Sequence, residues 1–370
     1  MIIGVPKETK IGEFRVALTP SGTETLRAQG HRVLIQKGAG ERAGFPDSDY
    51  RKAGAMLVAA KRAWGAEMIV KVKEPLTPEY KYLKPEQILF TFLHLAPNPA
   101  LVKALVQKKV TAVAYETVEA DKGKLPILEP MSEIAGRIAA LMGAYYQANP
   151  QGGRGVLFGG MPGVLPAHVV VLGGGTVGEN AARVALGLGS RVTILENRSE
   201  RMRYLDEILP QVETLMADPA AVRTAVSSAD ILIGAVHIPG ARTPQLVSRA
   251  MVKRMKPRSV IIDVAIDQGG SCETSHPTSH AEPTFIAEGV LHYAVPNMPG
   301  AYGRTSTLAL TNVTLHYIRL LALTPLAKLR KEAPGLAKGI QTHAGHLVSR
   351  PVAEAQHLSA SAIESLLRDP

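Results

Sequence analysis

The sequence has almost no cysteine, since Cys272 is the single one among 370 residues. A lone cysteine excludes a disulfide within the chain and a zinc site built from several cysteines, so no metal site is expected. Scarce cysteine is typical of a reducing compartment. The first apolar stretch has five residues before Pro6, too short for a secretory signal. We therefore expect a cytoplasmic protein.

A second absence is charge between Gly155 and Gly178, where no Asp, Glu, Lys or Arg occurs. An uncharged run of this length raises the question of a membrane helix. Ten glycines and prolines interrupt it, however, and these residues break helices. We expect a loop that leads into a buried strand, and no membrane partner.

The formal net charge of +10 would be compatible with a nucleic-acid partner. The sequence nevertheless lacks a basic run, zinc-finger spacing and aromatic residues interleaved with basic ones. Anionic small molecules explain the positive excess equally well. No nucleic-acid partner is therefore expected.

The chain is long enough for two domains and, with 46% hydrophobic and 20% charged residues, has ample material for their cores. Short β-branched segments alternate with helical ones, the pattern of parallel α/β layers. The expected strands are Ile2–Val5, Val33–Gln36, Met68–Val72, Ile88–Leu93, Val110–Tyr115, His168–Leu172, Arg191–Leu195, Ile231–Ala235 and Val260–Val264.

Helical segments are expected between and after these strands. The first, Thr19–Gln29, has Ser21 as a plausible cap with Glu24 three residues on. A long helix over 132–147 is expected to connect two domains. Another, over 305–323, leads to a C-terminal helical region. The simplest architecture inserts a second α/β domain into the first, with a cleft between them.

The most informative segment is HVVVLGGGTVGENAA, in which Gly173, Gly175 and Gly178 fit the pattern G-x-G-x-x-G after an apolar strand. Gly173 would permit the tight turn, Gly175 the close approach of a pyrophosphate, and Gly178 the packing of helix on strand. The helix N-terminus would offer N–H groups to the phosphates. The motif therefore predicts dinucleotide binding.

Glu196 ends the next strand, where a carboxylate accepts hydrogen bonds from the ribose hydroxyls. This acid favours NAD, because a 2′-phosphate would face a negative charge. The nearby Arg198 and Arg201 keep NADP open as an alternative.

Several predicted strands end in residues able to do chemistry, and ligands of open α/β sheets bind beyond the carboxyl ends of strands. Each has a structural alternative: Lys73 as an edge charge, Asp267 as the cap of a turn into Gly269 and Gly270, and Arg15 as a surface arginine. The set consists of Arg15, Lys71, Lys73, His94, Asp267, Asn297 and Met298.

His94 lies at the end of ILFTFLHLAP, and a lone histidine beside apolar residues is more often structural than catalytic. Alternation along a strand puts Ile88, Phe90, Phe92 and His94 on one face. His94 is the last member of this row before the chain turns away. We therefore expect it at the strand end, where a ligand would bind, rather than inside the core.

These motifs together resemble a known family over nearly the whole chain, from Met1 to about Ser349. The segments are GVPKETKIGEFRVALTP, KVKEP, FTFLHLA, AYETV, PMSEIAGR, GGRGVLFGG, VVVLGGGTVGENAA, DVAIDQGG and NMPG. They are similar to alanine dehydrogenases, a family related to the NAD-binding subunit of proton-translocating nicotinamide nucleotide transhydrogenase.

The resemblance implies roles for individual residues. Arg15 and Lys73 would hold the substrate, and His94 and Asp267 would be the acid–base residues. The residues that would line the cofactor, besides the three glycines, are Ser132, Thr176, Val177, Glu196, Arg201, Val236, Val264, Ala265, Ile266, Asp267, Val295, Asn297 and Met298. Glu196 stands where the family often has an aspartate, and the polar position expected near the adenine falls around Ala217, so no role is carried over to it.

The implied fold is α/β with two Rossmann-like doubly wound domains, the NAD domain at 129–303 inserted into a substrate domain at 1–128 and 304–370. The implied activity is the reversible NAD-dependent deamination of L-alanine to pyruvate and ammonia by a homohexamer. The alternatives are a transhydrogenase NAD-binding subunit, for which an Arg-Gln-Asp-type partner loop is missing, another small-amino-acid dehydrogenase, and a non-enzymatic NAD sensor.

Overall fold

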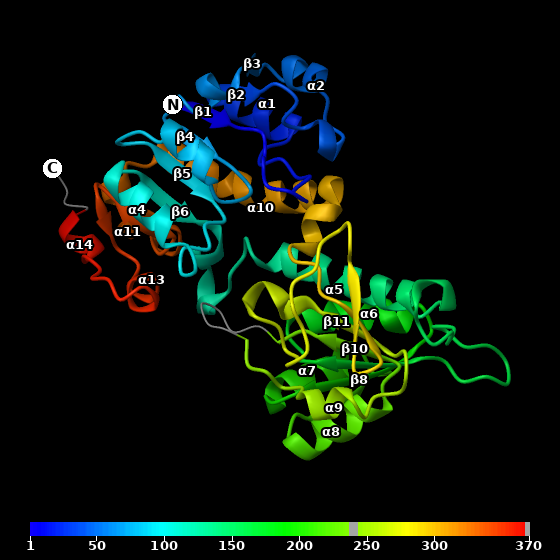
Figure 1. Ribbon diagram of the computed structural model, residues 1–370. Coiled ribbons are helices and arrows are strands. Elements are labelled where there is room, and N and C mark those ends of the chain that lie inside the picture. The colour runs from blue at the N-terminus through cyan, green and yellow to red at the C-terminus, as the bar shows by residue number, and fades with distance from the viewer. Residues whose placement is uncertain (237–242, 367–370) are drawn as a thin grey trace. The chain divides into compact units, whose positions relative to one another are not determined.

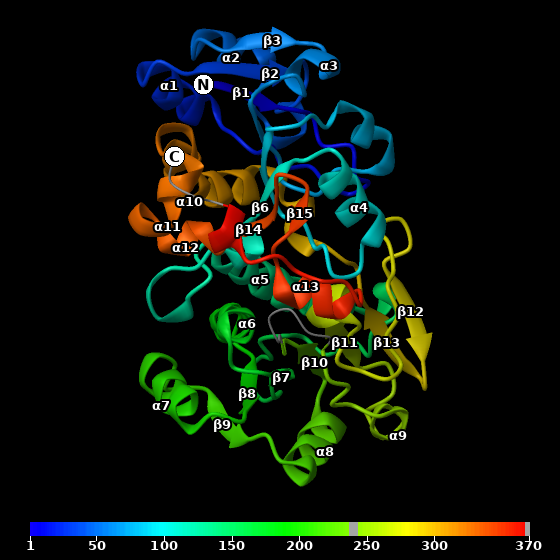
Figure 2. The same cartoon turned by 90° about the vertical axis from the view of Figure 1, so that its left-hand side faces the viewer.

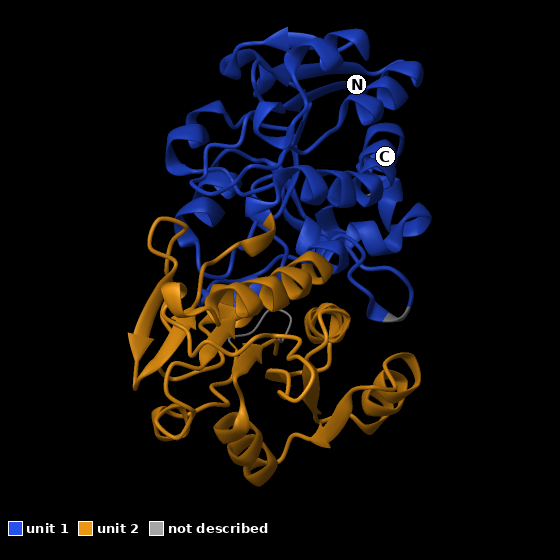
Figure 3. Cartoon of the chain, turned by 90° about the vertical axis from the view of Figure 1, so that its right-hand side faces the viewer, with its two compact units in different colours: residues 1–131, 300–370 blue, residues 132–299 orange. Residues whose placement is uncertain are grey.

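The computed structural model describes residues 1–236 and 243–366. The chain divides into two compact units, which Figure 3 colours separately. Unit 1 consists of Met1–Met131 and Gly300–Pro370, and unit 2 of Ser132–Pro299. The chain thus leaves unit 1 after Met131 and returns to it at Gly300, whereas the predicted domain boundaries are 128/129 and 303/304.

Unit 1 contains one sheet of eight strands among its described residues (Figure 1). Six strands are parallel, and their order, β3-β2-β1-β4-β5-β6, reverses direction between β1 and β4. Two antiparallel strands extend the sheet beyond β6 (Figure 2). The strands are β1 (Ile2–Val5), β2 (Arg32–Gln36), β3 (Met56–Val58), β4 (Met68–Val70), β5 (Ile88–Thr91), β6 (Thr111–Ala114), β14 (Ile340–His343) and β15 (His346–Leu347).

The central strands β4 and β5 are buried along their whole length, as expected of parallel strands covered on both faces. The helices α1 and α3 pack against β2. The helices of unit 1 are α1 (Pro20–Ala28), α2 (Asp47–Lys52), α3 (Ala60–Ala63), α4 (Pro99–Gln107), α10 (Gly303–Leu323), α11 (Leu326–Glu332), α12 (Pro334–Ala337), α13 (Arg350–Ala355) and α14 (Ile363–Leu366).

Unit 2 contains a seven-stranded sheet within its described part. The order β9-β8-β7-β10-β11-β13 is parallel and reverses between β7 and β10, and β12 pairs antiparallel with β13. The strands are β7 (His168–Leu172), β8 (Arg191–Glu196), β9 (Glu213–Met216), β10 (Ile231–Gly234), β11 (Val260–Asp263), β12 (Thr284–Ala287) and β13 (Val290–Tyr293).

The core of unit 2 joins apolar residues of β7, β8, β10 and β11 to those of two helices, α8 and α9. The helix after the glycine motif, α6, packs on β7 and β8. The helices are α5 (Glu129–Tyr146), which begins in unit 1, α6 (Thr176–Gly187), α7 (Ser199–Ile208), α8 (Pro219–Ser228) and α9 (Arg249–Val252). No helix among the described residues has the length and apolar character needed to span a bilayer.

The predicted fold class is confirmed, because both sheets have the strand order of doubly wound α/β domains. Two predictions of detail are wrong. The C-terminal region is not purely helical, since β14 and β15 complete the first sheet. The cap of the first helix is Thr19 rather than Ser21, because the Thr19 side chain accepts a hydrogen bond from the Gly22 amide.

Candidate active site

The carboxyl ends of the central strands in unit 1 carry charged residues that contact one another. Ligands of doubly wound sheets bind at these ends, where the strand order reverses. Two such residues come from adjacent strands: Lys73 follows β4 and His94 follows β5. The Lys73 Nζ lies 3.3 Å from the His94 Nε2. The structure therefore brings together two residues that the sequence singled out separately.

His94 has a left-handed backbone, with φ of 46°, which is uncommon for a residue other than glycine or asparagine. Such a conformation costs about 1–2 kcal/mol and persists only where surrounding contacts hold it. Here the Glu116 carboxylate accepts hydrogen bonds from the backbone N–H groups of Leu93, at 3.2 Å, and His94, at 2.7 Å.

The pKa of His94 is lowered well below its usual value. Burial of the imidazolium is the main cause, and the positive charges of Lys73, Lys10 and Arg15 add to it. The side chain is still 44% exposed, so water screens part of the effect. Because all these contributions oppose protonation, the imidazole is neutral around pH 7.

The predicted row of side chains ending at His94 is present, although the hydrogen-bonded strand ends at Thr91. Tyr115 contacts the rings of both Phe90 and Phe92 edge to face. The His94 ring is parallel to the Phe92 ring within 3°, at a centroid distance of 5.9 Å. His94 thus lies next to Phe92, but three residues beyond the strand and with a left-handed backbone, so the alternation of an extended strand does not account for its position.

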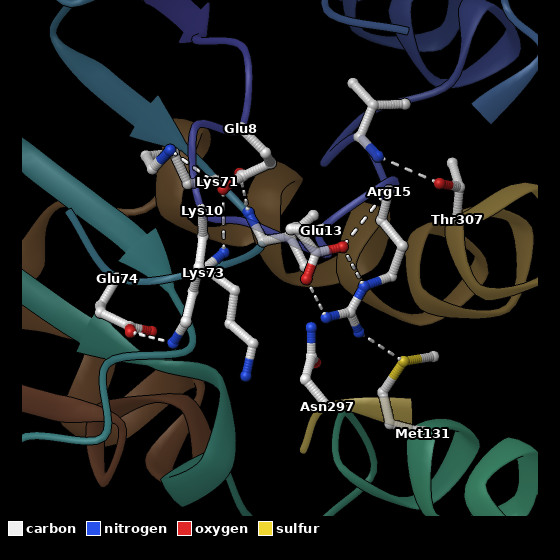
Figure 4. Close-up of polar contacts among 12 residues, drawn as sticks. Glu8, Lys10, Glu13, Arg15, Lys71, Lys73, Glu74, Met131, Asn297 and Thr307 are labelled. Carbon is white, nitrogen blue, oxygen red and sulfur yellow. Dashed lines mark hydrogen bonds and ion pairs between the residues drawn. The ribbon is translucent and has the colours of Figure 1, made fainter. Parts of the chain in front are cut away.

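Arg15 is buried and is not the surface residue of the structural alternative. Its guanidinium forms a two-pronged ion pair with Glu13, with Nε 2.6 Å from Glu13 Oε1 (Figure 4). Its Nη1 also contacts the Met131 sulfur at 3.0 Å. The neighbouring acid holds the guanidinium in one orientation, as a paired fork geometry does.

Lys71 and Lys73 have different environments, although they lie two residues apart. The Lys71 ammonium is 1% exposed and pairs with Glu8 at 3.0 Å (Figure 4). It also lies 3.6 Å from the Glu79 carboxylate. Glu8 also accepts a hydrogen bond from the Val72 amide. Lys71 and Glu8 therefore stabilise the segment after β4, whereas Lys73 extends to His94.

In unit 2 the glycine motif forms the turn between β7 and α6. Gly173 has φ of 95°, a conformation that side-chain-bearing residues rarely adopt. A Cβ on Gly178 would lie 1.9 Å from the Gly173 carbonyl oxygen, so α6 could not pack there with any larger residue. A Cβ on Gly175, the N-cap of α6, would meet no atom within 4 Å. These are the properties required to cradle a pyrophosphate at a helix N-terminus.

Glu196 ends β8 beside this turn and is 4% exposed. Its carboxylate accepts hydrogen bonds from the Gly174 amide, at 3.0 Å, and from the Arg198 guanidinium. Burial alone would raise the pKa of Glu196, but the hydrogen bonds from Arg198 and the backbone outweigh it and lower the pKa. Arg201 donates to the Gly174 carbonyl and to Glu179, so both arginines near the turn pair with acids.

Asp267 lies exposed in a 3-10 turn, η6 (Val264–Gln268), directly after β11. It does not cap the following glycines, because the Gly269 and Gly270 amides bond to backbone carbonyls. Its Oδ2 accepts instead from the Asn297 amide at 3.0 Å. The residue that organises the turn is the buried Asp263, which accepts from the amides of Ser271 and Cys272.

The other predicted cofactor residues of unit 2 follow the carboxyl ends of neighbouring strands, with one exception. Ser132 lies on α5. The rest are Thr176 and Val177 after β7, Val236 after β10, Val264, Ala265 and Ile266 after β11, and Val295, Asn297 and Met298 after β13.

Sequence reasoning missed Glu8, Glu13 and Glu116. Each lies in a segment that marked the family resemblance, yet none was assigned a role. Glu116 could have been found by the rule that selected Lys73 and His94, because it closely follows a buried strand, β6. Glu8 and Glu13 could not, because they lie in the irregular stretch between β1 and α1.

A doubly wound unit with a glycine-rich turn at a helix N-terminus, joined to a second unit with cations and an imidazole at strand ends, is typical of oxidoreductases that use a nicotinamide dinucleotide. The chain belongs to the alanine dehydrogenase/PNT family. Its N-terminal domain model matches residues 4–135 and its C-terminal domain model matches residues 139–350.

Relatives match over the full length. An alanine dehydrogenase of Methanococcus maripaludis is 52% identical, and the alignment covers 100% of both proteins. One of Bacillus subtilis is also 52% identical, over 95% of this chain and 94% of that protein. A solved L-alanine dehydrogenase structure matches with a TM-score of 0.93 and 51% identity, over 96% of this chain and 99% of that one. A transhydrogenase from Sinorhizobium meliloti, 24% identical with a TM-score of 0.81, shares the fold.

Proposed function

We propose that this protein catalyses the reversible oxidative deamination of L-alanine with NAD. The balanced reaction is L-alanine, NAD⁺ and water to pyruvate, NADH, ammonium and a proton. The observation that carries the proposal is the contact between Lys73 and His94 at the ends of β4 and β5. Full-length relatives named alanine dehydrogenases support the same substrate.

The substrate carboxylate needs a cation, which Arg15 supplies. Glu13 holds the guanidinium in a fixed orientation, so little freedom is lost when a carboxylate binds. Lys73 offers a point charge for the substrate carbonyl oxygen, which favours nucleophilic addition to that carbon. Positioning of this kind contributes more to a hydride transfer than acid–base chemistry does.

His94 accepts the proton released as water adds to the imine and the carbinolamine collapses, and it returns the proton in the reverse direction. Its lowered pKa suits this role, because a neutral imidazole at neutral pH has a lone pair to accept with. Asp267 would orient the water, or hold ammonium in the reverse reaction.

The residues of unit 2 fit a dinucleotide. The space at Gly175 and the N-terminus of α6 suit a pyrophosphate, and Glu196 suits the adenosine ribose. The nicotinamide ring of the bound cofactor supplies the hydride acceptor. Arg198 and Arg201 both pair with acids, so binding the 2′-phosphate of NADP would require these pairs to break. The pairing therefore favours NAD over NADP.

The test is to incubate the purified protein with NAD and a panel of L-amino acids and to follow the absorbance of NADH. We expect rapid reduction with L-alanine, and oxidation of NADH with pyruvate plus ammonium. Lack of reduction with every amino acid would overturn the proposal. The predictions of a homohexamer and a cytoplasmic location are tested by analytical ultracentrifugation and by cell fractionation.

A further inference from the structure

The backbone of His94 depends on one neighbouring acid. Two successive N–H groups, of Leu93 and His94, converge on the Glu116 carboxylate. Such convergence requires one residue in the left-handed region, and His94 supplies it with φ of 46°. The same carboxylate therefore stabilises the left-handed backbone of His94 and, through it, sets the orientation of the imidazole side chain.

The sheet explains why Glu116 reaches this position. Thr91 of β5 pairs with Ala114 of β6 in parallel register, so the two strands end side by side. Glu116 follows Ala114 by two residues, in the 3-10 turn η3 (Tyr115–Thr117), and His94 follows Thr91 by three. The short turn directs the Glu116 carboxylate to the segment leaving β5.

Keeping the Glu116 carboxylate ionised in the folded protein costs free energy. Its side chain is 19% exposed, and burial raises its pKa despite the hydrogen bonds from His94 and Leu93. A neutral glutamine of similar shape would avoid this desolvation. A glutamine would, however, turn an NH₂ donor towards the Leu93 N–H, from which both carboxylate oxygens accept, so the anion has a role beyond packing.

The ring geometry indicates that role. A lysine ammonium can only donate, so the contact between Lys73 Nζ and His94 Nε2 makes Nε2 the acceptor. In the neutral ring the proton is then on Nδ1, which lies 3.9 Å from Glu116 Oε1. This distance is too long for a hydrogen bond, so the carboxylate acts on the Nδ1 proton through its charge. The Phe92 ring lies parallel to the imidazole, at a centroid distance of 5.9 Å.

We propose that Glu116 is a positioning residue that holds the His94 backbone in its left-handed conformation and favours the tautomer with the proton on Nδ1. The lone pair of Nε2 is thereby kept on the side of Lys73, ready to accept a proton. This inference rests on the proposed function, in which His94 is the acid–base residue.

The first test compares Glu116→Gln with Glu119→Gln. Glu119 follows the same strand but pairs with Lys338 on the surface, so it is a matched control. For Glu116→Gln we expect kcat with L-alanine to fall by roughly 10- to 100-fold, with KM changed less than about twofold. Because the weakened hydrogen bonds also support the His94 backbone, Tm should fall by no more than about 4 °C, and the protein should stay folded at the assay temperature. Glu116→Asp, which keeps the charge on a shorter stem, should recover part of kcat. Activity that falls only in proportion to the fraction of folded protein at the assay temperature would overturn the proposal.

The second test uses a double variant. Because Glu116 acts through His94, Glu116→Gln should cost nothing further in a His94→Asn background, and asparagine tolerates the left-handed backbone. Effects that multiply in the double variant would show that Glu116 acts independently of His94, which would contradict the proposal.

The third test requires no substrate. In ¹⁵N NMR spectra of the histidine-labelled protein, the His94 nitrogens should report the Nδ1–H tautomer, and Glu116→Gln should shift the population toward Nε2–H. An unchanged tautomer in the variant would overturn the inference. This readout remains valid if no amino acid is oxidised, so failure of the proposed function is distinguishable from failure of the inference.

Discussion

In unit 1 the residues beyond β1, β4, β5 and β6 are charged and largely buried, whereas in unit 2 the turn beyond β7 is made of glycines. The order of the six parallel strands is the same in both sheets. Unit 1 holds its functional groups by pairing side chains, as Glu13 does with Arg15. Unit 2 has glycines in this turn, and because they lack side chains a ligand can approach the backbone N–H groups.

The difference follows from what each unit is proposed to bind. A small carboxylate such as pyruvate offers few atoms, so recognition requires charges in fixed positions. A dinucleotide offers a long phosphate group, which the backbone at a helix N-terminus can cradle. The same strand topology can therefore bind either kind of ligand. The residues at the strand ends determine which ligand a unit binds.

The largest expected effect is a loss of turnover from a change in unit 1 that leaves cofactor binding by unit 2 nearly unchanged. His94→Ala, or His94→Asn, should lower turnover by roughly 10²–10⁴-fold because the proton acceptor is lost, while the Kd for NADH changes little. Steady-state rates and NADH fluorescence titration measure the two quantities. His316→Ala, at an exposed site on α10, is the control. Near-normal turnover in the His94 variants would remove His94 from the mechanism.

The converse prediction concerns unit 2. Gly178→Ala should destabilise the protein by about 3 kcal/mol and weaken NADH binding at least tenfold, because the new Cβ overlaps the Gly173 carbonyl. Gly187→Ala, on the same helix, introduces a Cβ with no atom within 4 Å and should be neutral or stabilising. Chemical denaturation and NADH titration provide the measurements. Equal behaviour of the two variants would refute the close-packing argument.

A third prediction compares a buried histidine, His292, with an exposed one, His316. Burial lowers the pKa of His292 to about 4, so the folded state resists protonation while the unfolded chain gains a proton below about pH 6.5. Its contribution to stability is therefore present above pH 6.5 and is lost as the pH falls toward 4.

Between pH 7 and pH 5 this loss amounts to about 2 kcal/mol. His292→Gln should flatten the pH dependence of the unfolding free energy by that amount, relative to His316→Gln at an exposed site. Urea denaturation at the two pH values tests it. Parallel curves for the two variants would show that His292 titrates normally.

The smallest effect concerns the charges around His94. Lys73, Lys10 and Arg15 oppose its protonation, and Glu116 lies on the other side of the ring. Lys10→Gln should raise the pKa of His94 and move the acid limb of the kcat/KM profile upward by a few tenths of a pH unit. Lys10→Arg keeps the charge and should leave the limb in place. A downward shift with Lys10→Gln would contradict the electrostatic account.

Much of unit 2 could be predicted from the sequence, because its motif is local. The strand, the glycines and the next strand are contiguous, and each requirement applies to neighbouring residues. Even so, the partners of Glu196 were not predicted. The carboxylate bonds to Gly174 and Arg198, and its contact with Gly174 depends on how β7 and β8 align.

Unit 1 was less predictable, because its site combines residues from separate strands. Lys73 and His94 were selected one at a time, and nothing in their spacing showed that they touch. The strands β14 and β15 were missed for a related reason: four- and two-residue strands carry little periodicity.

The sequence by itself determined the α/β class, most of the parallel strands, the glycine turn and the candidate residues at strand ends, since each of these depends on local pattern. Only the tertiary structure decided that Arg15 pairs with Glu13 and that Glu116 bonds to the His94 backbone. It also decided that Lys71 pairs with Glu8 whereas Lys73 contacts His94. These contacts are between side chains or segments brought together by strand order and register, which no local pattern encodes.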